Sequence, residues 1–257
     1  MTTFKSSNIC TVNTKTDNSG GFTILIPAYD ELPNLRVLLP EISTAINSLP
    51  HNPKEILVVL ASFATISEVN EITNLGAKTV IRSPTNSFGD AIRTGFANAS
   101  AFSEYIITID ADGSHSPATI PKLLAVAPGA HLVTGSRYMK GGSTDVKLSL
   151  RIMSRLLNFA FGFVFGLESK DLSGNFKLYK KSSLSNFTLD GKNFDVLQEL
   201  IFKMKVHHGS RFVVKEVPYH FSERNTGKSK RKLLSFIVSY LKTLLKLILL
   251  SLKFRFK

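Results

Sequence analysis

Short apolar runs alternate with helix-like segments along most of this chain. The segments expected to be helices are 35–46, 67–75, a segment beginning near 89, 147–166 and 194–209. The runs expected to be strands are 22–27, 55–61, 77–82, 105–110, 131–137, 174–180 and 212–221. This alternation predicts an α/β fold in which a mostly parallel sheet is flanked by helices. Pro40 lies within the first predicted helix and could break it.

Polar side chains follow several of the predicted strands at the point where each strand ends. These segments are 27–31, 61–63, 110–112 and 135–137. The carboxyl ends of parallel strands meet at one edge of a sheet. The four segments therefore predict one shared ligand-binding crevice. No Gly-x-Gly-x-x-Gly follows the first strand and no Walker-type loop occurs, which argues against dinucleotide and P-loop sites.

The segment YIITIDADGSHSP ends an apolar run on Asp110 and Asp112, with only Ala111 between them. Two neighbouring carboxylates repel each other, so a cation is expected beside them. Carboxylate oxygens suit Mg²⁺ or Mn²⁺, ions that usually keep some waters and also bind substrate phosphates. The alternative is a capped turn, in which the acids accept hydrogen bonds from backbone N–H groups ahead of a helix at Pro117.

The formal net charge of +13 predicts an anionic partner. Much of the excess lies at the carboxyl end, because the 34 residues after Glu223 contain no acid and ten Lys or Arg. Nucleic acid is not the partner that we expect, since the aromatic residues do not interleave with this basic cluster. The single cysteine, Cys10, excludes an internal disulfide, and residues 1–21 are expected to form a flexible leader rather than a signal peptide.

Residues 231–257 form a basic and largely apolar tail, which is predicted to lie on a membrane surface as an amphipathic helix. Its polar side chains, including Lys242 and Lys246, recur at helical spacing and form one stripe. Two lysines in the middle of a transmembrane helix are costly, whereas a helix in the interface keeps them in water near anionic headgroups. The alternative is a tail helix that docks on the protein core or on a membrane partner subunit.

Six segments between residues 22 and 230, in order and at sensible spacing, resemble motifs of the GT-A glycosyltransferases of family 2. They are similar especially to the dolichyl-phosphate mannose synthase and polyprenyl-phosphate glycosyltransferase branch. The segments are ILIPAYDEL, DADGSHSP, GSRYMKGG, RIMSRLLN, DLSGNFKLYKKSSL and KEVPYHFSERNTGKSK. The resemblance implies a GT-A, Rossmann-like domain over 22–230. It also implies inverting, metal-assisted transfer of a sugar from GDP-mannose or a UDP-hexose to a polyprenyl or dolichyl phosphate, at the cytoplasmic face of a membrane.

Carried over position by position, the resemblance implies roles for individual residues. Asp110 and Asp112 would hold Mg²⁺ or Mn²⁺. The other implied substrate contacts are Pro27, Tyr29 and Glu31 in the nucleoside pocket, Arg137, Arg151, Arg224 and Lys230 near the phosphates, Ser154 near the acceptor, and Ala111. Asp112, Arg137 and Arg224 would be the catalytic residues. For each basic residue, an ordinary surface charge is the alternative.

No nucleophile–base constellation stands out in the sequence, and the implied reaction does not need one. A lipid phosphate is already anionic at neutral pH, so it can attack the anomeric carbon without a general base. His115 is therefore expected to be structural.

Two departures from the family pattern leave the activity open. After the second strand the family usually has VVDDGSxDGT, whereas this chain has VVLASFATIS, so Leu60 and Ala61 stand in place of two acids. Losing an acidic acceptor for the base commonly costs about 1.5–3 kcal/mol. In addition, Ser114 replaces a family Gln that follows the Asp-x-Asp. Three alternatives follow. The protein is an enzyme that binds the donor base through other groups, a slow or unusually selective enzyme, or an inactive membrane adaptor that binds nucleotide or lipid phosphate. We prefer an active enzyme, because Asp110, Asp112, Arg137 and Arg224 are all present.

Overall fold

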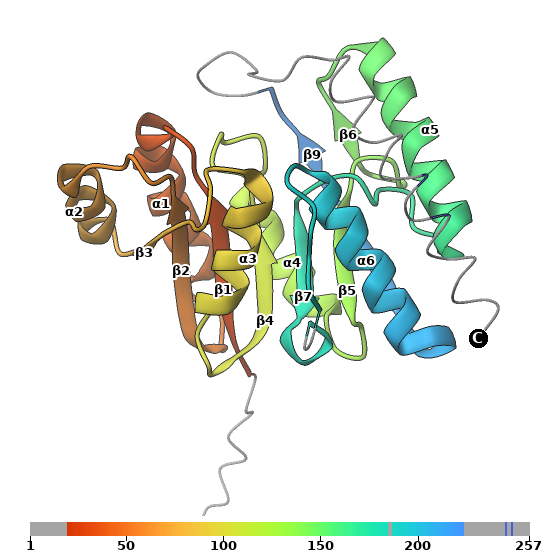
Figure 1. Cartoon of the computed structure of the whole chain (residues 1–257), viewed down its shortest axis with the longest axis horizontal. Helices are drawn as coiled ribbons and strands as arrows, with labels where there is room; N and C mark the ends of the chain where they lie inside the picture. The colour runs from red at the N-terminus through yellow and green to blue at the C-terminus, as the bar shows by residue number, and fades with distance from the viewer. Residues whose placement is uncertain (1–19, 185–186, 224–244, 246–247, 249–257) are drawn as a thin grey trace, which may run out of the picture.

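The computed structural model describes residues 20–184, 187–223, 245 and 248, and its centre is a seven-stranded sheet with helices on both faces (Figure 1). The strands, in their order across the sheet, are β3 (Lys78–Ile81), β2 (Asn52–Leu60), β1 (Gly20–Pro27), β4 (Ser103–Thr108), β7 (Lys177–Lys180), β5 (Leu132–Ser136) and β8 (Val214–Pro218). A small second sheet pairs β6 (Ser143–Thr144) with β9 (His220–Phe221). The helices are α1 (Leu32–Asn47), α2 (Ile66–Asn74), α3 (Phe88–Asn98), α4 (Ile120–Val126), α5 (Leu148–Phe165) and α6 (Asp195–His208), with 3₁₀ turns η1 (Pro117–Thr119), η2 (Lys181–Ser183) and η3 (Gly209–Arg211).

The apolar core lies in layers on the two faces of the sheet. Ile24 and Ile26 of β1 pack in a cluster with residues of α1 and α4, whereas Leu25 between them packs with residues of α3 and α6. Successive side chains of a strand point to opposite faces, and both faces are covered here, so β1 is apolar throughout. A third cluster joins α5 and α6 to β5 and β7 through residues such as Phe161 and Leu132.

The predicted α/β fold is confirmed. Each predicted helix and strand before residue 222 is present, and the last predicted strand is divided into β8 and β9. Helix α1 continues through Pro40, which lies on its exposed face, so the possible break at this residue does not occur. Gly20 and Gly21, which were assigned to the leader, begin β1. The rest of the leader and the 231–257 tail, apart from Leu245 and Ile248, lie outside the described residues.

Strand β7 runs antiparallel between β4 and β5, whereas the other pairings in the seven-stranded sheet are parallel. Its amino end therefore lies at the edge where β1, β4 and β5 have their carboxyl ends. Lys177, its first residue, pairs with Thr108 of β4 and with Thr134 of β5. The segment 171–176 is thereby placed between the end of β4, which carries Asp110, and the end of β5, which carries Arg137.

Candidate active site

Asp110 and Asp112 lie directly beyond the end of β4, in different surroundings. The Asp110 side chain is 19 % exposed, and its Oδ1 accepts a hydrogen bond from Asn175 Nδ2 at 2.8 Å. Asp112 is 6 % exposed, and its Oδ1 accepts hydrogen bonds from the backbone N–H of Ser114 at 3.1 Å and from its hydroxyl at 2.6 Å. Asp112 thus forms the capped turn that was the alternative to a metal site, while the Asp110 carboxylate accepts a side-chain amide instead.

His115 packs beneath the loop of residues 110–114 and holds it in place through a hydrogen bond. It is buried, and its ring lies against Phe176, Tyr219 and Phe221, with centroids 5.1, 5.6 and 5.3 Å away. Its Nδ1 accepts the backbone N–H of Asp110 at 3.2 Å, which fixes the position of that residue. Burial lowers the pKa of His115, and the charge of Asp110 opposes this only in part, so the imidazole is neutral near pH 7. This environment agrees with the structural role expected of His115.

The donor atoms at the end of β4 fit an ion that takes only part of its coordination shell from the protein. Within the described part of the chain, no group of three or more His, Cys, Asp or Glu side chains is placed to hold a metal ion. Mg²⁺ is commonly held by one or two carboxylates, with substrate phosphates and water in the remaining positions. Among the described residues, Asp110 Oδ2 accepts no hydrogen bond, since its neighbour His115 Nδ1, at 3.9 Å, is itself an acceptor. The Asp110 carboxylate therefore fits Mg²⁺ or Mn²⁺, whereas one oxygen of Asp112 is already engaged by Ser114.

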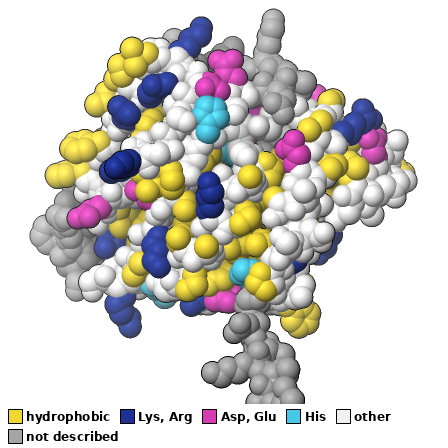
Figure 2. Space-filling view, turned by 180° about the vertical axis from the view of Figure 1, so that it is seen from behind, with side chains coloured by type: hydrophobic (Ala, Val, Ile, Leu, Met, Phe, Trp, Pro, Cys, Tyr) yellow, Lys and Arg dark blue, Asp and Glu magenta, His cyan; other side chains and the backbone are white. Residues whose placement is uncertain are grey.

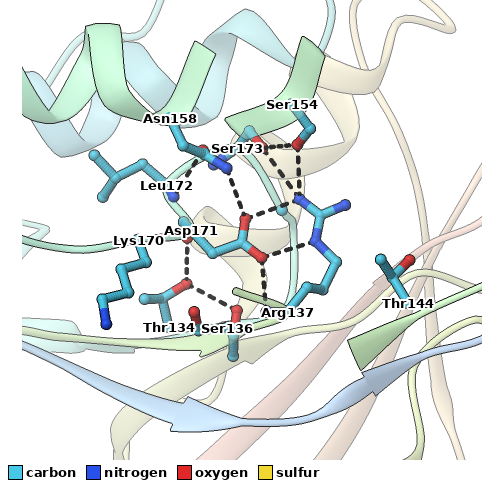
Figure 3. A network of polar contacts seen from close by, with 12 residues as sticks. Thr134, Ser136, Arg137, Thr144, Ser154, Asn158, Lys170, Asp171, Leu172 and Ser173 are labelled. Atoms are coloured by element: carbon cyan, nitrogen blue, oxygen red, sulfur yellow. Dashed lines mark hydrogen bonds and ion pairs between the residues drawn. The ribbon is translucent and has the colours of Figure 1, made fainter. Parts of the chain in front are cut away.

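The second part of the candidate site is a polar network around Arg137, the residue that follows β5 (Figure 3). Its Nε and Nη2 donate to the two carboxylate oxygens of Asp171 at 2.7 and 2.8 Å, and its backbone N–H donates to the same carboxylate at 3.0 Å. The Asp171 side chain is fully buried and that of Arg137 is 11 % exposed. The guanidinium carbon of Arg137 lies 5.0 Å from the ring centre of Tyr138 and 5.4 Å from that of Phe221. The two aromatic rings therefore also stabilise the charged guanidinium.

Helix α5 contributes polar side chains to the same network (Figure 3). Ser154 Oγ accepts a hydrogen bond from Arg137 Nη2 at 3.3 Å and lies 3.3 Å from Ser173 Oγ, which accepts from the same Nη2 at 3.2 Å. One turn later, Asn158 Oδ1 accepts the backbone N–H groups of Leu172 and Ser173 at 3.0 and 2.8 Å. The inner face of α5 therefore fixes the loop that carries Asp171.

Two further cations lie near this network. Arg151, at the start of α5, donates from Nη2 to the Thr144 carbonyl at 2.7 Å, and its buried Nε has no hydrogen-bond partner among the described residues. Lys177 is fully buried, and its Nζ donates to the Gly174 carbonyl. Burial lowers the pKa of Lys177 to about 8, although the negative charge of Asp171 acts in the opposite direction. Two basic side chains beyond Arg137 thus lie in this part of the molecule.

The turn after β1 carries three of the predicted nucleoside contacts. Pro27 ends the strand, and Tyr29 is exposed beyond it. Asp30 has a φ of 58°, a left-handed conformation that is uncommon for a residue other than glycine. Glu31 is the N-cap residue of α1, and its Oε2 accepts a hydrogen bond from Asn34 at 2.6 Å. Among the described residues, the Glu31 side chain makes no capping hydrogen bond to the backbone, and its carbonyl accepts the N–H groups of Asn34 and Leu35.

The end of β2, where the acids are missing, is occupied by a buried arginine. Leu60 and Ala61 are both buried. Arg82, which follows β3, donates from Nε to the Leu60 carbonyl at 3.2 Å and from Nη2 to the carbonyls of Val59, at 3.0 Å, and of Ala28. The guanidinium thus satisfies the carbonyl groups at the ends of β1 and β2.

Comparison with known proteins assigns the family. Residues 23–188, more than half of the chain, match the model of glycosyl transferase family 2. The chain belongs to this family. Among its relatives, the dolichol-phosphate mannosyltransferase of Saccharomyces cerevisiae is 25 % identical over 224 residues, covering 81 % of this chain and 80 % of that protein. The dolichol-phosphate mannosyltransferase of Pyrococcus furiosus is 30 % identical over 218 residues, covering 82 % of this chain and 59 % of that protein. The polyprenol monophosphomannose synthase of Mycolicibacterium smegmatis is 33 % identical over 130 residues, about half of each chain.

Solved structures confirm the GT-A-like fold. Glucosyl-3-phosphoglycerate synthase from Mycobacterium tuberculosis, solved with Mn²⁺, uridine diphosphate and phosphoglyceric acid, superposes with a TM-score of 0.66. The match covers 90 % of this chain and 79 % of that chain at 17 % identity, so it concerns the fold alone. The protein is a family 2 glycosyltransferase with a GT-A-like domain.

In the fold of this glycosyltransferase, some of the predicted site residues contact one another and others do not. Arg137 and Ser154 belong to one hydrogen-bonded network. The Ala111 side chain is buried in the core, so only its backbone is offered to the crevice. Arg224 and Lys230 lie outside the described residues. The role assigned to each of these residues stays a prediction.

Several residues of the crevice were missed from the sequence. The segment 171–184 was matched to a family motif, yet no role was given to Asp171, Ser173 or Asn175. Burial disfavours both members of the Arg137–Asp171 pair, but their mutual hydrogen bonds and charges outweigh this, raising the pKa of Arg137 and lowering that of Asp171. A buried arginine needs a counter-charge, but no local sequence signal identifies Asp171 as its partner, because the two residues are 34 positions apart.

Proposed function

We propose that this glycosyltransferase moves a hexose from a nucleoside-diphosphate sugar, GDP-mannose or a UDP-hexose, to a polyprenyl phosphate at the cytoplasmic face of a membrane. One observation carries the proposal: helix α5 has the polar network around Arg137 on its inner face and an exposed apolar stripe on its outer face. An acceptor with a phosphate head and a hydrocarbon tail matches that combination. The names of the three relatives agree with it, since each acts on a dolichol or polyprenol.

The apolar stripe of α5 consists of Leu148, Ile152, Leu156, Phe159 and Phe163, which recur at steps of three or four residues and are between 52 and 82 % exposed. Within the described part of the chain, α5 is long and apolar enough to cross a membrane by length and composition. Its opposite face packs on the protein through Phe161 and Phe165, which favours a helix that lies in the membrane interface over one that spans it. Burying such a side chain fully is worth roughly 1.5–3 kcal/mol, so the stripe as a whole can anchor the domain.

The surroundings of the stripe suit an anionic bilayer. Hydrophobic side chains project along the left margin of the space-filling view, the side on which α5 lies after the half-turn from Figure 1, and Lys and Arg side chains lie beside them (Figure 2). Lys147 and Arg155 are exposed basic side chains of this part of the chain, whereas Arg151 is partly buried and donates to the Thr144 carbonyl. Basic side chains near an anionic leaflet add about 1 kcal/mol each to binding.

The reaction requires little proton transfer from the protein. An oxygen of the acceptor phosphate attacks the anomeric carbon as the bond from that carbon to the diphosphate oxygen breaks, and the nucleoside diphosphate leaves with the electron pair. Arg137 and Ser154 orient the acceptor phosphate, and the fixed charge of Arg137 lowers the repulsion between the two phosphate groups. His115, being buried and neutral, serves the site by holding Asp110 in place.

The donor half of the proposal places Mg²⁺ or Mn²⁺ on Asp110 and Asp112. A bound divalent ion stabilises the negative charge that develops on the departing diphosphate. Asn175 and Ser114 orient the two carboxylates through the hydrogen bonds described above. Preorganised ligands of this kind reduce the reorganisation needed when the donor binds.

A second function is favoured by the substitution at the end of β2. With Leu60 and Ala61 in place of two acids, the chain would be a membrane adaptor that binds nucleotide or lipid phosphate without turning over. The deciding assay incubates the full-length protein with Mn²⁺, a short-chain polyprenyl phosphate and labelled GDP-mannose or UDP-glucose. If the protein is an enzyme, label from at least one donor should appear in the organic phase, and the Asp112→Asn variant should lose that label. Binding of the lipid phosphate without transfer from any donor would favour the adaptor instead.

A further inference from the structure

The edge of the sheet beside Asp110 carries two aromatic side chains that the proposed chemistry does not use fully. Tyr29 follows β1 and is 42 % exposed, and Phe63 follows β2 and is 51 % exposed. Their ring centroids are 5.1 Å apart, and the rings are nearly perpendicular, at 84°. Exposed aromatic residues that contact each other at a ligand-binding edge offer an apolar face to a planar group. We call these two residues the aromatic pair.

The backbone beneath the aromatic pair is fixed by polar contacts. Besides its bonds to the ends of β1 and β2, the guanidinium of Arg82 lies 5.8 Å from the ring centre of Tyr29. The turn that carries Phe63 is held by Asn86, whose Oδ1 accepts the N–H of Ser62 and whose Nδ2 donates to the Ser62 hydroxyl, both at 2.8 Å. The aromatic pair is therefore presented by ordered loops.

The strand order sets the reach between the aromatic pair and Asp110. Strand β1 lies between β2 and β4, so Phe63 and Asp110 follow strands that are two positions apart. Neighbouring strands are about 4.8 Å apart, which separates these strand ends by about 10 Å. A nucleoside spans such a distance between its base and its diphosphate. A donor whose diphosphate lies at Asp110 can therefore reach the aromatic pair with its base.

We infer that Phe63, with Tyr29, binds the donor base by aromatic contact and that this site distinguishes poorly between guanine and uracil. The inference rests on the proposed donor site and specifies how that site reads its base. Ala61 offers the base edge no acidic acceptor. The Arg82 guanidinium is used by the carbonyls of Leu60, Val59 and Ala28, and Glu31 Oε2 accepts a hydrogen bond from Asn34. Stacking tolerates any base, because every base has a π-face, whereas discrimination between bases needs hydrogen bonds to their edges.

The experiment measures the dissociation constants of GDP and UDP for the full-length protein in Mn²⁺ by titration calorimetry. The wild-type constants should lie within about tenfold of each other, and Phe63→Ala should weaken both nucleotides about tenfold or more while leaving their ratio unchanged. Phe63→Trp should retain binding. The matched control is Phe102→Ala, which removes an equally large and more exposed ring from the turn before β4, at the opposite edge of the sheet.

Two results would overturn the inference: a Phe63→Ala protein that binds both nucleotides like the wild type, or a wild-type preference for one base above about 100-fold. Failure of the proposed function looks different. If nucleotides bind and depend on Phe63 but no hexose reaches the lipid phosphate, the transferase proposal fails and the assignment of Phe63 stands. Absence of binding by any nucleotide would refute both.

Discussion

Replacing Asp171 by asparagine should destabilise the domain strongly, because it leaves a buried guanidinium without its counter-charge. Asp171 is fully buried and accepts three hydrogen bonds from Arg137. Removing one partner of a buried ion pair costs about 3–5 kcal/mol. Each kcal/mol lowers the melting temperature of a protein of this size by about 2–4 °C, so Asp171→Asn should melt roughly 10 °C below the wild type.

Circular dichroism melts of wild type, Asp171→Asn, Arg137→Met and the double variant test this. The double variant should lose less stability than the sum of the two single variants, since it leaves no unpaired charge. The control is Asp145→Asn, which breaks the exposed pair between Asp145 and His220 and should cost less than about 1 kcal/mol. A melting temperature of Asp171→Asn within about 2 °C of the wild type, or strict additivity in the double variant, would refute the reasoning.

The same pair gives a pH dependence of known sign. The pKa of Asp171 is lowered in the folded protein, so its contribution to stability is complete above the pKa of an unfolded aspartate, about 3.9. That contribution disappears as the pH falls through the lower pKa of the folded state. The stability difference between wild type and Asp171→Asn should therefore shrink in acid.

Three other predictions follow from the crevice and from α5. Asp110→Asn should abolish Mn²⁺-dependent transfer yet shift the melting temperature by less than about 2 °C, since no described Lys or Arg pairs with Asp110; full turnover by the wild type in excess EDTA would refute the metal assignment. Leu156→Gln combined with Phe163→Gln should release the protein from anionic liposomes in a sedimentation assay without unfolding it, because both side chains are exposed and the change adds no charge; unchanged sedimentation would place the membrane contact elsewhere. Between about pH 8 and 10, Lys177 holds a proton in the unfolded chain that it has lost in the folded protein, so wild-type stability should rise with pH relative to Lys177→Met. An equal stability difference between the two proteins at about pH 7.5 and pH 9.5, measured by urea denaturation, would contradict this.

The sequence predicts the elements of this fold well because their signals are local. The run ILI at residues 24–26 is apolar throughout since β1 is covered on both faces, and it reads as a strand without any knowledge of its neighbours. The position of Asp110 at a strand end is equally local. Pairing is not: nothing in KLYK at 177–180 indicates that it runs antiparallel between β4 and β5.

The candidate site was predicted less completely for the same reason. Arg137 was expected to be a phosphate ligand, and its ion pair with Asp171, 34 residues away, depends on how β7 enters the sheet. The carbonyl contacts of Arg82 depend on three strands meeting, so no sequence window contains them. Helix α5 shows a further limit, since an apolar helical pattern indicates an amphipathic helix without saying which apolar residues, such as Phe163, remain exposed.

The insertion of β7 between β4 and β5 also determines when the sheet can be completed during synthesis. At about 5–20 residues per second, the ribosome needs about 3–14 s to make the roughly 70 residues between the end of β4 and the start of β7. Through that interval one edge of β4, with the apolar residues Ile106 and Ile107, has no partner strand. Unpaired apolar edges recruit other chains. Slow codons between residues 109 and 176 should therefore lower the yield of soluble protein more than slow codons placed after residue 180.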